Sequence, residues 1–210
     1  MINSRFTKEQ YSASEAQYKA HEIAFGPITF QVSRLMVKFG LFQLLSDHKA
    51  GLKTKELAAK SNLSIYAAQV LLESSLTTGT VYFKEDKYFL SKVGWFFLND
   101  EMVRVNMNFN HDVNYKGMFH LEEALLKAEP SGLQELGDWD TIYEGLSSLA
   151  PDVQKSWFDF DHFYSDNSFK QALNIVFAEP VKKLMDIGGN TGKWALTCVD
   201  FNLDVEVTIV

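Results

Sequence analysis

The sequence predicts a mainly α-helical protein that starts with a helical domain carrying a β-hairpin and finishes with one β-α-β unit. Three observations predict this fold class. Apolar residues recur every three or four positions over most of the 210 residues. Two short β-prone runs flank a charged turn at Lys84-Glu85-Asp86. Residues 181–210 change to an apolar run, a glycine turn, a helical pattern and a second apolar run.

The composition narrows the class of protein. Hydrophobic residues make up 46% and charged residues 22%, as in globular proteins. The formal net charge of −7 argues against a general nucleic-acid binder, which needs Lys and Arg to replace counterions on phosphates. Cys198 has no second cysteine to pair with, so a reducing, cytoplasmic compartment is expected. No run reaches the roughly 18 apolar residues of a membrane span, so no membrane partner is expected.

The first helices are predicted around Gly26-Pro27, because proline suits the first turn of a helix. From Ile28 to Leu44 the apolar residues occupy two sides of one predicted helix. A helix that is apolar on two sides is buried on both. One side therefore packs on its own domain, and the other is available for a partner chain.

The next segment has the order of a winged helix: helix–turn–helix, then hairpin. Thr54 is the expected N-cap of the first helix, Ser64 caps the second, and Gly79 ends it. The second helix contains no Lys or Arg, which a helix in the DNA major groove needs. In chain order these elements are helix 54–60, helix 65–78, strand 80–83 and strand 87–90.

Residues 101–180 are predicted to be a helical linker of at least three helices. The first carries apolar residues from Met118 to Leu126, and Pro130-Ser131-Gly132 ends it. Pro151 starts the second, which runs to about Tyr164. A third is expected from Phe169 to Phe177.

The glycine turn carries the strongest chemical signal. In Asp186-Ile-Gly-Gly-Asn-Thr-Gly192 an acidic residue ends a strand, and glycines lead into a helix. Gly188 allows a tight turn, and Gly192 allows the helix to pack close to the sheet. A ligand can then lie against the open backbone near the positive end of the helix. The spacing does not fit the G-x-G-x-x-G form of a dinucleotide site.

The turn resembles instead the D-x-G-x-G-x-G motif of class I methyltransferases, with Asn190 in place of the second glycine. Asn is the non-glycine residue that best tolerates left-handed backbone, so the turn is expected to survive the replacement. The whole chain resembles the winged-helix, S-adenosylmethionine-dependent O-methyltransferases, including the hydroxyindole O-methyltransferase-like proteins. The stretch Phe160-Asp-His-Phe-Tyr-Ser165 is similar to the F-x-x-x-M-S motif of that family, with Tyr164 replacing its methionine.

This resemblance implies an enzyme that methylates a small hydroxylated, aromatic molecule. It divides the chain into a winged-helix dimerisation domain (1–100), a helical linker and cavity region (101–180) and the truncated start of a Rossmann-like α/β domain (181–210). Residues 1–100 are expected to form a homodimer, with no nucleic acid as partner. The implied cofactor-binding residues are Asp186, Gly188, Gly189, Asn190 and Gly192. The implied cavity residues are Phe160, His162, Phe163 and Tyr164.

The resemblance also implies that some catalytic parts are missing from these 210 residues. The family's ribose-binding acid follows the second strand, and its general base, a histidine, lies further on. The chain by itself is therefore expected to be inactive, with weak or no binding of S-adenosylmethionine and no catalytic residue of its own. No metal site is expected, since no histidine has a metal-ligand spacing with Cys198 or another histidine. The alternatives are a winged-helix DNA-binding regulator and a non-catalytic dimerisation module derived from a methyltransferase.

Overall fold

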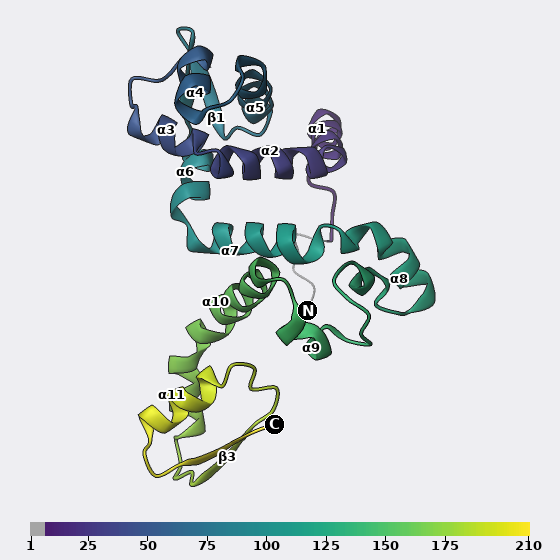
Figure 1. Cartoon of the computed structure of the whole chain (residues 1–210), viewed down its shortest axis with the longest axis vertical. Helices are drawn as coiled ribbons and strands as arrows, with labels where there is room; N and C mark the ends of the chain where they lie inside the picture. Colours follow the sequence, from purple (N-terminus) through teal and green to yellow (C-terminus); the bar gives the residue numbers. More distant parts are fainter. Residues whose placement is uncertain (1–6) are drawn as a thin grey trace. The chain divides into compact units, whose positions relative to one another are not determined.

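A computed structural model describes residues 7–210 and divides the chain into two compact units, one ending at Val103 and the other beginning at Arg104 (Figure 1). The first six residues of the predicted N-terminal domain lie outside the described part. The first unit contains, in order, α1 (Ala13–Ala24), α2 (Gly26–Lys38), α3 (Leu41–Asp47), α4 (Thr54–Ser61), α5 (Ile65–Thr77), β1 (Val81–Lys84), β2 (Lys87–Leu90), α6 (Lys92–Asn99) and the first residues of α7 (Glu101–Phe109).

The helix predicted from Ile28 to Leu44 is two helices, so that expectation was wrong. The chain turns at Gly40, whose φ of 70° is left-handed and cannot continue an α-helix. α2 and α3 can therefore approach the same core from different directions. Thr54 was also misassigned, because the N-cap of α4 is Lys53, whose backbone N–H donates to Glu56 Oε2 at 2.7 Å.

The predicted helix–turn–helix and hairpin elements are present. Ser64 Oγ accepts a hydrogen bond from the backbone N–H of Ala67 at 3.0 Å, which caps α5 as expected. β1 and β2 pair antiparallel, leaving Glu85 and Asp86 as a two-residue loop with φ of 52° and 62°. Two left-handed residues in such a loop are typical of the type I′ turn, whose twist matches the strands.

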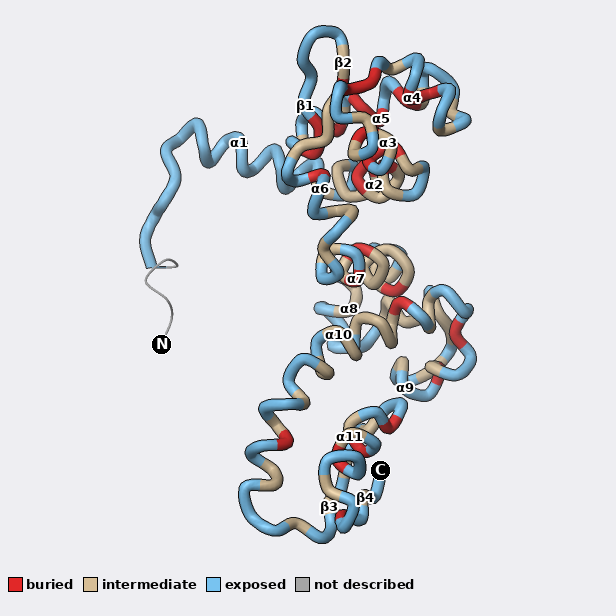
Figure 2. The backbone as a smooth tube through the Cα atoms, turned by 90° about the vertical axis from the view of Figure 1, so that its left-hand side faces the viewer, coloured by how far each residue is buried: buried red, intermediate tan, exposed pale blue. Residues whose placement is uncertain are grey.

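The core of the first unit lies between α2, α3, α4, α5 and the hairpin, where Figure 2 shows the buried backbone gathered. By contrast, α1 contributes no buried side chain, although Ser12 and Glu15 cap its first turn reciprocally. The burial of apolar area drives this assembly. The buried cluster comprises Val32, Met36, Leu41, Phe42, Leu45, Leu52, Leu57, Leu71, Leu72, Val81 and Tyr88.

The second unit is built around one long helix, α10 (Pro151–Val176). The two helices predicted on either side of residues 165–168 are therefore one. That polar segment, Ser165-Asp-Asn-Ser168, contains neither glycine nor proline to end a helix. The other elements are η2 (Asn110–Asn114, a π-helical turn), η3 (Gly117–His120), α8 (Leu121–Lys127), η4 (Ser131–Glu135), α9 (Ile142–Gly145), η5 (Leu146–Ser148), β3 (Lys183–Asp186), α11 (Lys193–Phe201) and β4 (Glu206–Ile209).

The segment that carries Met118 to Leu126 was predicted as one helix and is divided in the structure. Met118 lies in η3, and only the residues from Leu121 onward belong to α8. Its apolar side chains are largely solvent-exposed, with Leu126 81% exposed. Amphipathic spacing therefore identified a helical segment here, but not its boundaries or its burial.

The predicted order of strand, helix and strand at residues 181–210 is confirmed. β3 and β4 pair in parallel, with Lys183 opposite Glu206 and Asp186 opposite Ile209. α11 connects them, as a parallel pair requires a crossover. Among residues 7–210, no helix combines the length and the apolar character needed to cross a bilayer.

Candidate functional site: the glycine turn after β3

The glycine turn occupies the five residues between β3 and α11 that follow Ile187. Gly188, Asn190 and Gly192 have φ of 70°, 47° and 76°, so three of the five residues are left-handed. Glycine adopts this conformation without steric cost, and Asn is the next most tolerant residue. The prediction that Asn190 preserves the turn in place of a glycine is therefore confirmed for the backbone conformation.

Backbone hydrogen bonds fix both ends of the turn. The N–H of Gly188 donates to the carbonyl of Val210 at 2.8 Å, which extends the β3–β4 ladder into the turn. The N–H of Gly192 donates back to the carbonyl of Gly189 at 2.7 Å, which closes the turn on itself. The turn is thus a defined loop at the carboxyl end of a parallel strand, the edge where open α/β sheets bind ligands.

Asp186 forms the floor of the turn. A Cβ built on Gly189 would lie 2.6 Å from Asp186 Oδ2, so only glycine lets the backbone approach this carboxylate so closely. Oδ2 is buried and accepts no hydrogen bond within the described residues. A buried carboxylate oxygen without a donor is unfavourable. At Gly188, in contrast, a Cβ would meet nothing within 4 Å, so that side of the turn is open to a ligand.

α10 supplies the polar neighbours of the turn. The side-chain amide of Asn190 donates to Asp161 Oδ2, and Lys193 Nζ forms an ion pair with Asp166. Thr191 Oγ1 lies 3.1 Å from a ring nitrogen of His162, within hydrogen-bond distance. Three side chains in and just after the turn are therefore held by one helix.

The four predicted cavity residues do not gather at one point. Phe160 stacks on Phe109 of α7 with ring centroids 3.9 Å apart, and the hydroxyl of Tyr164 donates to Asn106 Oδ1 at 2.9 Å. His162 faces the glycine turn instead. Positions 160 and 164 share one face of a helix, while 162 lies on the opposite side.

Phe163 lies next to Tyr164, with the two rings edge to face and their centroids 5.2 Å apart. Among the described contacts of the four predicted cavity residues, only that of His162 reaches the turn. The sequence analysis missed Asp161, which contacts the turn, and Asp166, which pairs with Lys193 just after it. Both lie within or next to the F-x-x-x-M-S-like stretch. The motif therefore identified the segment that lies near the turn, but not the carboxylates that make the contacts.

Cys198 of α11 is completely buried. Burial raises the pKa of its thiol, and the nearby negative charge of Asp186 raises it further. The thiol is therefore protonated at neutral pH, which argues against a thiolate nucleophile or metal ligand. Among the described residues, no three His, Cys, Asp or Glu side chains are grouped closely enough to hold a metal ion.

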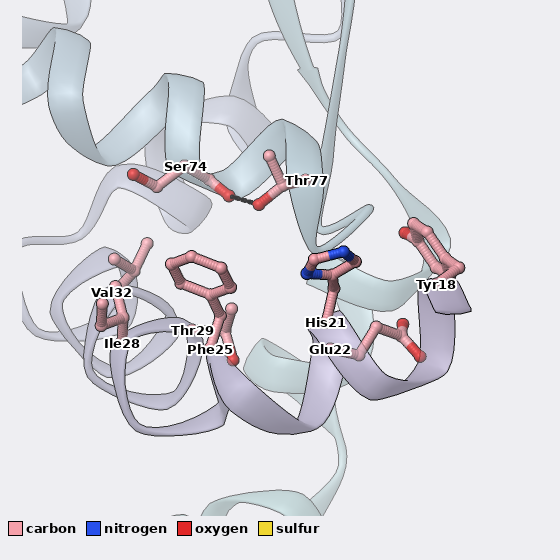
Figure 3. A pocket seen from close by; sticks show the side chains of 9 residues that line it. All are labelled: Tyr18, His21, Glu22, Phe25, Ile28, Thr29, Val32, Ser74 and Thr77. Atoms are coloured by element: carbon pink, nitrogen blue, oxygen red, sulfur yellow. Dashed lines mark hydrogen bonds between the residues drawn. The ribbon is translucent and has the colours of Figure 1, made fainter. Parts of the chain in front are cut away.

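The first unit carries a separate apolar groove between α1, α2 and α5, with a volume of about 380 Å³ (Figure 3). The ring of Phe25 lies beneath Ser74 and Thr77 of α5, and His21 lies beside it. Phe25 and Ile28 are 54% and 57% exposed, which is high for large apolar side chains. The groove is lined by Tyr18, His21, Glu22, Phe25, Ile28, Thr29, Val32, Ser74 and Thr77.

Comparison with known families places this groove within a matched segment. Residues 17–88 match the family described as the Dimerisation2-like domain. This match covers the N-terminal helices and most of the hairpin. A search of curated protein sequences finds no significant match.

Solved structures with a similar fold span nearly the whole chain. The apo structure of the S-adenosylmethionine-dependent methyltransferase SibL matches with a TM-score of 0.63, 20% identity and 89% coverage of this chain. The mitomycin 7-O-methyltransferase MmcR matches with a TM-score of 0.67, 16% identity and 93% coverage. Human N-acetylserotonin methyltransferase, in complex with SAM, matches with a TM-score of 0.56, 17% identity and 95% coverage.

Because these sequence identities are low, the likeness establishes the fold alone. The chain spans 55%, 58% and 59% of the length of those three solved chains. The mainly helical architecture thus resembles part of the fold of these methyltransferases.

Proposed function

We propose that this chain is part of an S-adenosylmethionine-dependent O-methyltransferase that acts on a small hydroxylated, aromatic molecule. The observation that carries the proposal is the left-handed glycine turn at the end of β3, in a chain whose first unit matches a dimerisation domain. In this assignment residues 1–100 form a winged-helix dimerisation domain, 101–180 a helical cavity region and 181–210 the start of a Rossmann-like domain. Its place of action is the cytoplasm.

The residues of the turn fit the methionine end of the cofactor. Gly188 presents open backbone, and Gly189 and Gly192 keep side chains out of the space around Asp186 and Ile209. Asp186, Gly188, Gly189, Asn190 and Gly192 would border the cofactor, which supplies an electrophilic methyl group when bound. Phe160, His162, Phe163 and Tyr164 are the proposed cavity residues.

The chemical contribution of these residues is positioning. Holding the substrate oxygen in line with a methyl donor accounts for much of the rate in such transfers. Proton removal from the hydroxyl needs a general base, which typically contributes about 10²–10⁴-fold. We assign no base among these 210 residues, and we expect the chain by itself to be inactive.

Calorimetric titration tests the cofactor assignment. S-adenosylmethionine is titrated into this chain and into the full-length product of its gene. The proposal predicts binding by the full-length product, with a rise in melting temperature from linkage, and weak or no binding by the 210-residue chain. No heat and no rise in melting temperature with the full-length product would overturn the methyltransferase assignment.

We propose a second copy of this chain as the partner that covers the groove between α1 and α2. Support comes from the match of residues 17–88 to a dimerisation domain and from the exposure of Phe25 and Ile28 within the groove. Placing a charge in a buried apolar interface is strongly unfavourable. Phe25→Glu should therefore give monomers in sedimentation velocity.

Tyr66→Glu is the matched control for that variant, because Tyr66 is 78% exposed on α5 and does not line the groove. It should leave the dimer intact. Monomeric wild-type protein, or dissociation by both variants alike, would contradict the assignment. A gel shift at low salt tests the DNA-binding alternative, and specific binding would favour it over the enzyme.

A further inference from the structure

The glycine turn has an asymmetry in how its left-handed residues are supported. Gly188 and Gly192 adopt positive φ without a Cβ, whereas Asn190 adopts a φ of 47° with a side chain attached. Left-handed backbone is unfavourable for any residue with a Cβ, even though Asn tolerates it best. The conformation at position 190 therefore depends on a compensating interaction more than the conformations at 188 and 192 do.

That interaction is a hydrogen bond across the unit. Asn190 Nδ2 donates to Asp161 Oδ2, twenty-nine residues earlier in the chain. Its acceptor is a carboxylate, and charge-assisted hydrogen bonds are stronger than neutral ones. Asp161 belongs to α10, a helix of 26 residues, so the acceptor is presented from a regular element rather than from another loop.

Two neighbouring contacts also hold α10 against the turn and the start of α11. Thr191 Oγ1 lies 3.1 Å from His162 Nε2, and Lys193 pairs with Asp166. His162 Nδ1 also lies 3.5 Å from Asp166 Oδ1, which ties the two α10 residues together. These contacts keep α10 and the turn together, so the carboxylate of Asp161 stays within reach of the amide at 190.

We propose that Asp161 is a positioning residue for the cofactor turn. By holding the side-chain amide of Asn190, it keeps the left-handed backbone in place and so maintains the open surface at Gly188 where the cofactor would lie. Asp161 acts through Asn190 and does not touch the cofactor. The proposal rests on the proposed function in that S-adenosylmethionine is the ligand of the turn.

A double-mutant cycle between positions 161 and 190 tests this. Asp161→Ala, Asn190→Gly and the double variant are made in the full-length gene product, and S-adenosylhomocysteine binding is measured by calorimetry. This probe lacks the positive sulfonium of the methyl donor, so the lost carboxylate charge has less direct effect on it. We expect Asp161→Ala to weaken binding by about five- to tenfold, since the turn then spends most of its time outside its binding conformation.

The expected signature is rescue by glycine. Asn190→Gly provides the background in which that support is dispensable, because glycine needs no support at positive φ. In that background Asp161→Ala should have almost no further effect, within about twofold, so the two changes are non-additive. Asp161→Asn, which keeps an oxygen acceptor for the amide, should stay within about threefold of wild type.

Asp159→Ala is the matched control. Asp159 is an acid on the same helix that pairs with Lys155, one turn earlier, rather than with the glycine turn. It should leave binding within about twofold of wild type. Equal weakening by Asp159→Ala, or an undiminished effect of Asp161→Ala in the Asn190→Gly background, would overturn the positioning role.

Amide hydrogen exchange of residues 187–193 separates this inference from the proposed function. Without any ligand, Asp161→Ala should exchange faster there than Asp159→Ala does. If the wild-type protein binds no S-adenosylhomocysteine, the proposed function fails, and exchange alone decides the role of Asp161. Equal exchange in the two variants would overturn it in either case.

Discussion

The two units bury their apolar side chains to different extents, and the candidate site lies in the unit that buries fewer of them. In the first unit Met36, Leu41, Phe42, Leu57 and Leu72 are completely buried. In the second, the long helix α10 buries only Ser156 and Leu173. The first unit therefore has a contiguous apolar core, whereas the glycine turn lies in a unit that buries fewer apolar side chains, among them Val105, Met107 and Cys198.

Ser156 shows how the second unit uses polar contacts. Its hydroxyl donates to Asp112 Oδ2 at 2.6 Å, and this hydrogen bond joins α10 to η2. Meanwhile Met185, Ile187 and Ile209, in or beside β3 and β4, are between 51% and 78% exposed. Segments with few buried apolar contacts open more readily than core segments. We therefore expect the candidate cofactor site to open more readily than the core of the first unit.

The largest expected effect is the loss of a core side chain. Phe42→Ala should lower the free energy of unfolding of the first unit by about 3–5 kcal/mol, because a large buried ring leaves a cavity. Leu126→Ala in the second unit, where the side chain is 81% exposed, should change stability by less than about 0.5 kcal/mol. Hydrogen exchange of residues 32–90 under increasing urea measures the first effect, and equal losses from both variants would contradict the difference in burial between the two units.

A smaller effect is expected at the tightest point of the turn. Gly189→Ala places a Cβ 2.6 Å from Asp186 Oδ2 and 2.7 Å from Ile209 Cγ2, so a side chain or the backbone has to move. Such overpacking typically costs about 1–3 kcal/mol. The rate of amide hydrogen exchange at residues 186–193 should therefore rise.

Gly26→Ala in the first unit is the control for that substitution, because its Cβ would meet nothing within 4 Å and the backbone has no positive φ. It should be neutral or stabilising by up to about 1 kcal/mol. If Gly189→Ala is as well tolerated as Gly26→Ala, the turn is looser than its contacts indicate.

The smallest expected effect is a pH dependence of the hairpin in the first unit. The hydrogen bond and positive charge of Lys53, 2.7 Å away, lower the pKa of Asp86 below its ordinary value of 3.8. A carboxyl whose folded pKa is lowered stabilises the fold above its unfolded pKa, and this is lost as pH falls through the folded pKa. Lys53→Gln should therefore melt below wild type at about pH 6, and the difference should shrink toward about pH 2. A difference independent of pH would mean that the pair contributes nothing.

Local signals predicted the individual elements well. Ser64 capping α5, the helix Lys193–Phe201 and the hairpin around Glu85-Asp86 depend on residues a few positions apart, and the structure confirms all three. The break at Gly40 was missed because apolar spacing continued across it. The uninterrupted course of α10 was missed because its polar middle resembled a linker.

The site was predicted only in part. The tolerance of Asn for left-handed backbone predicted that position 190 can have a positive φ, but not which side chain supports it. That Phe160 and Tyr164 lie on the opposite side of α10 from His162 could be stated only once α10 was known to be one regular helix.

By itself, then, the sequence determined the local elements and the positions of the glycine turn that can be left-handed, because those depend on backbone preferences within a few residues. Only the tertiary structure decided which helix supports the turn. Asp161 and Asn190 are twenty-nine positions apart, and no pattern along the chain links them. They meet because α11 packs on α10, where Phe169 and Trp194 lie with ring centroids 5.0 Å apart, and that packing sets which polar side chains face each other.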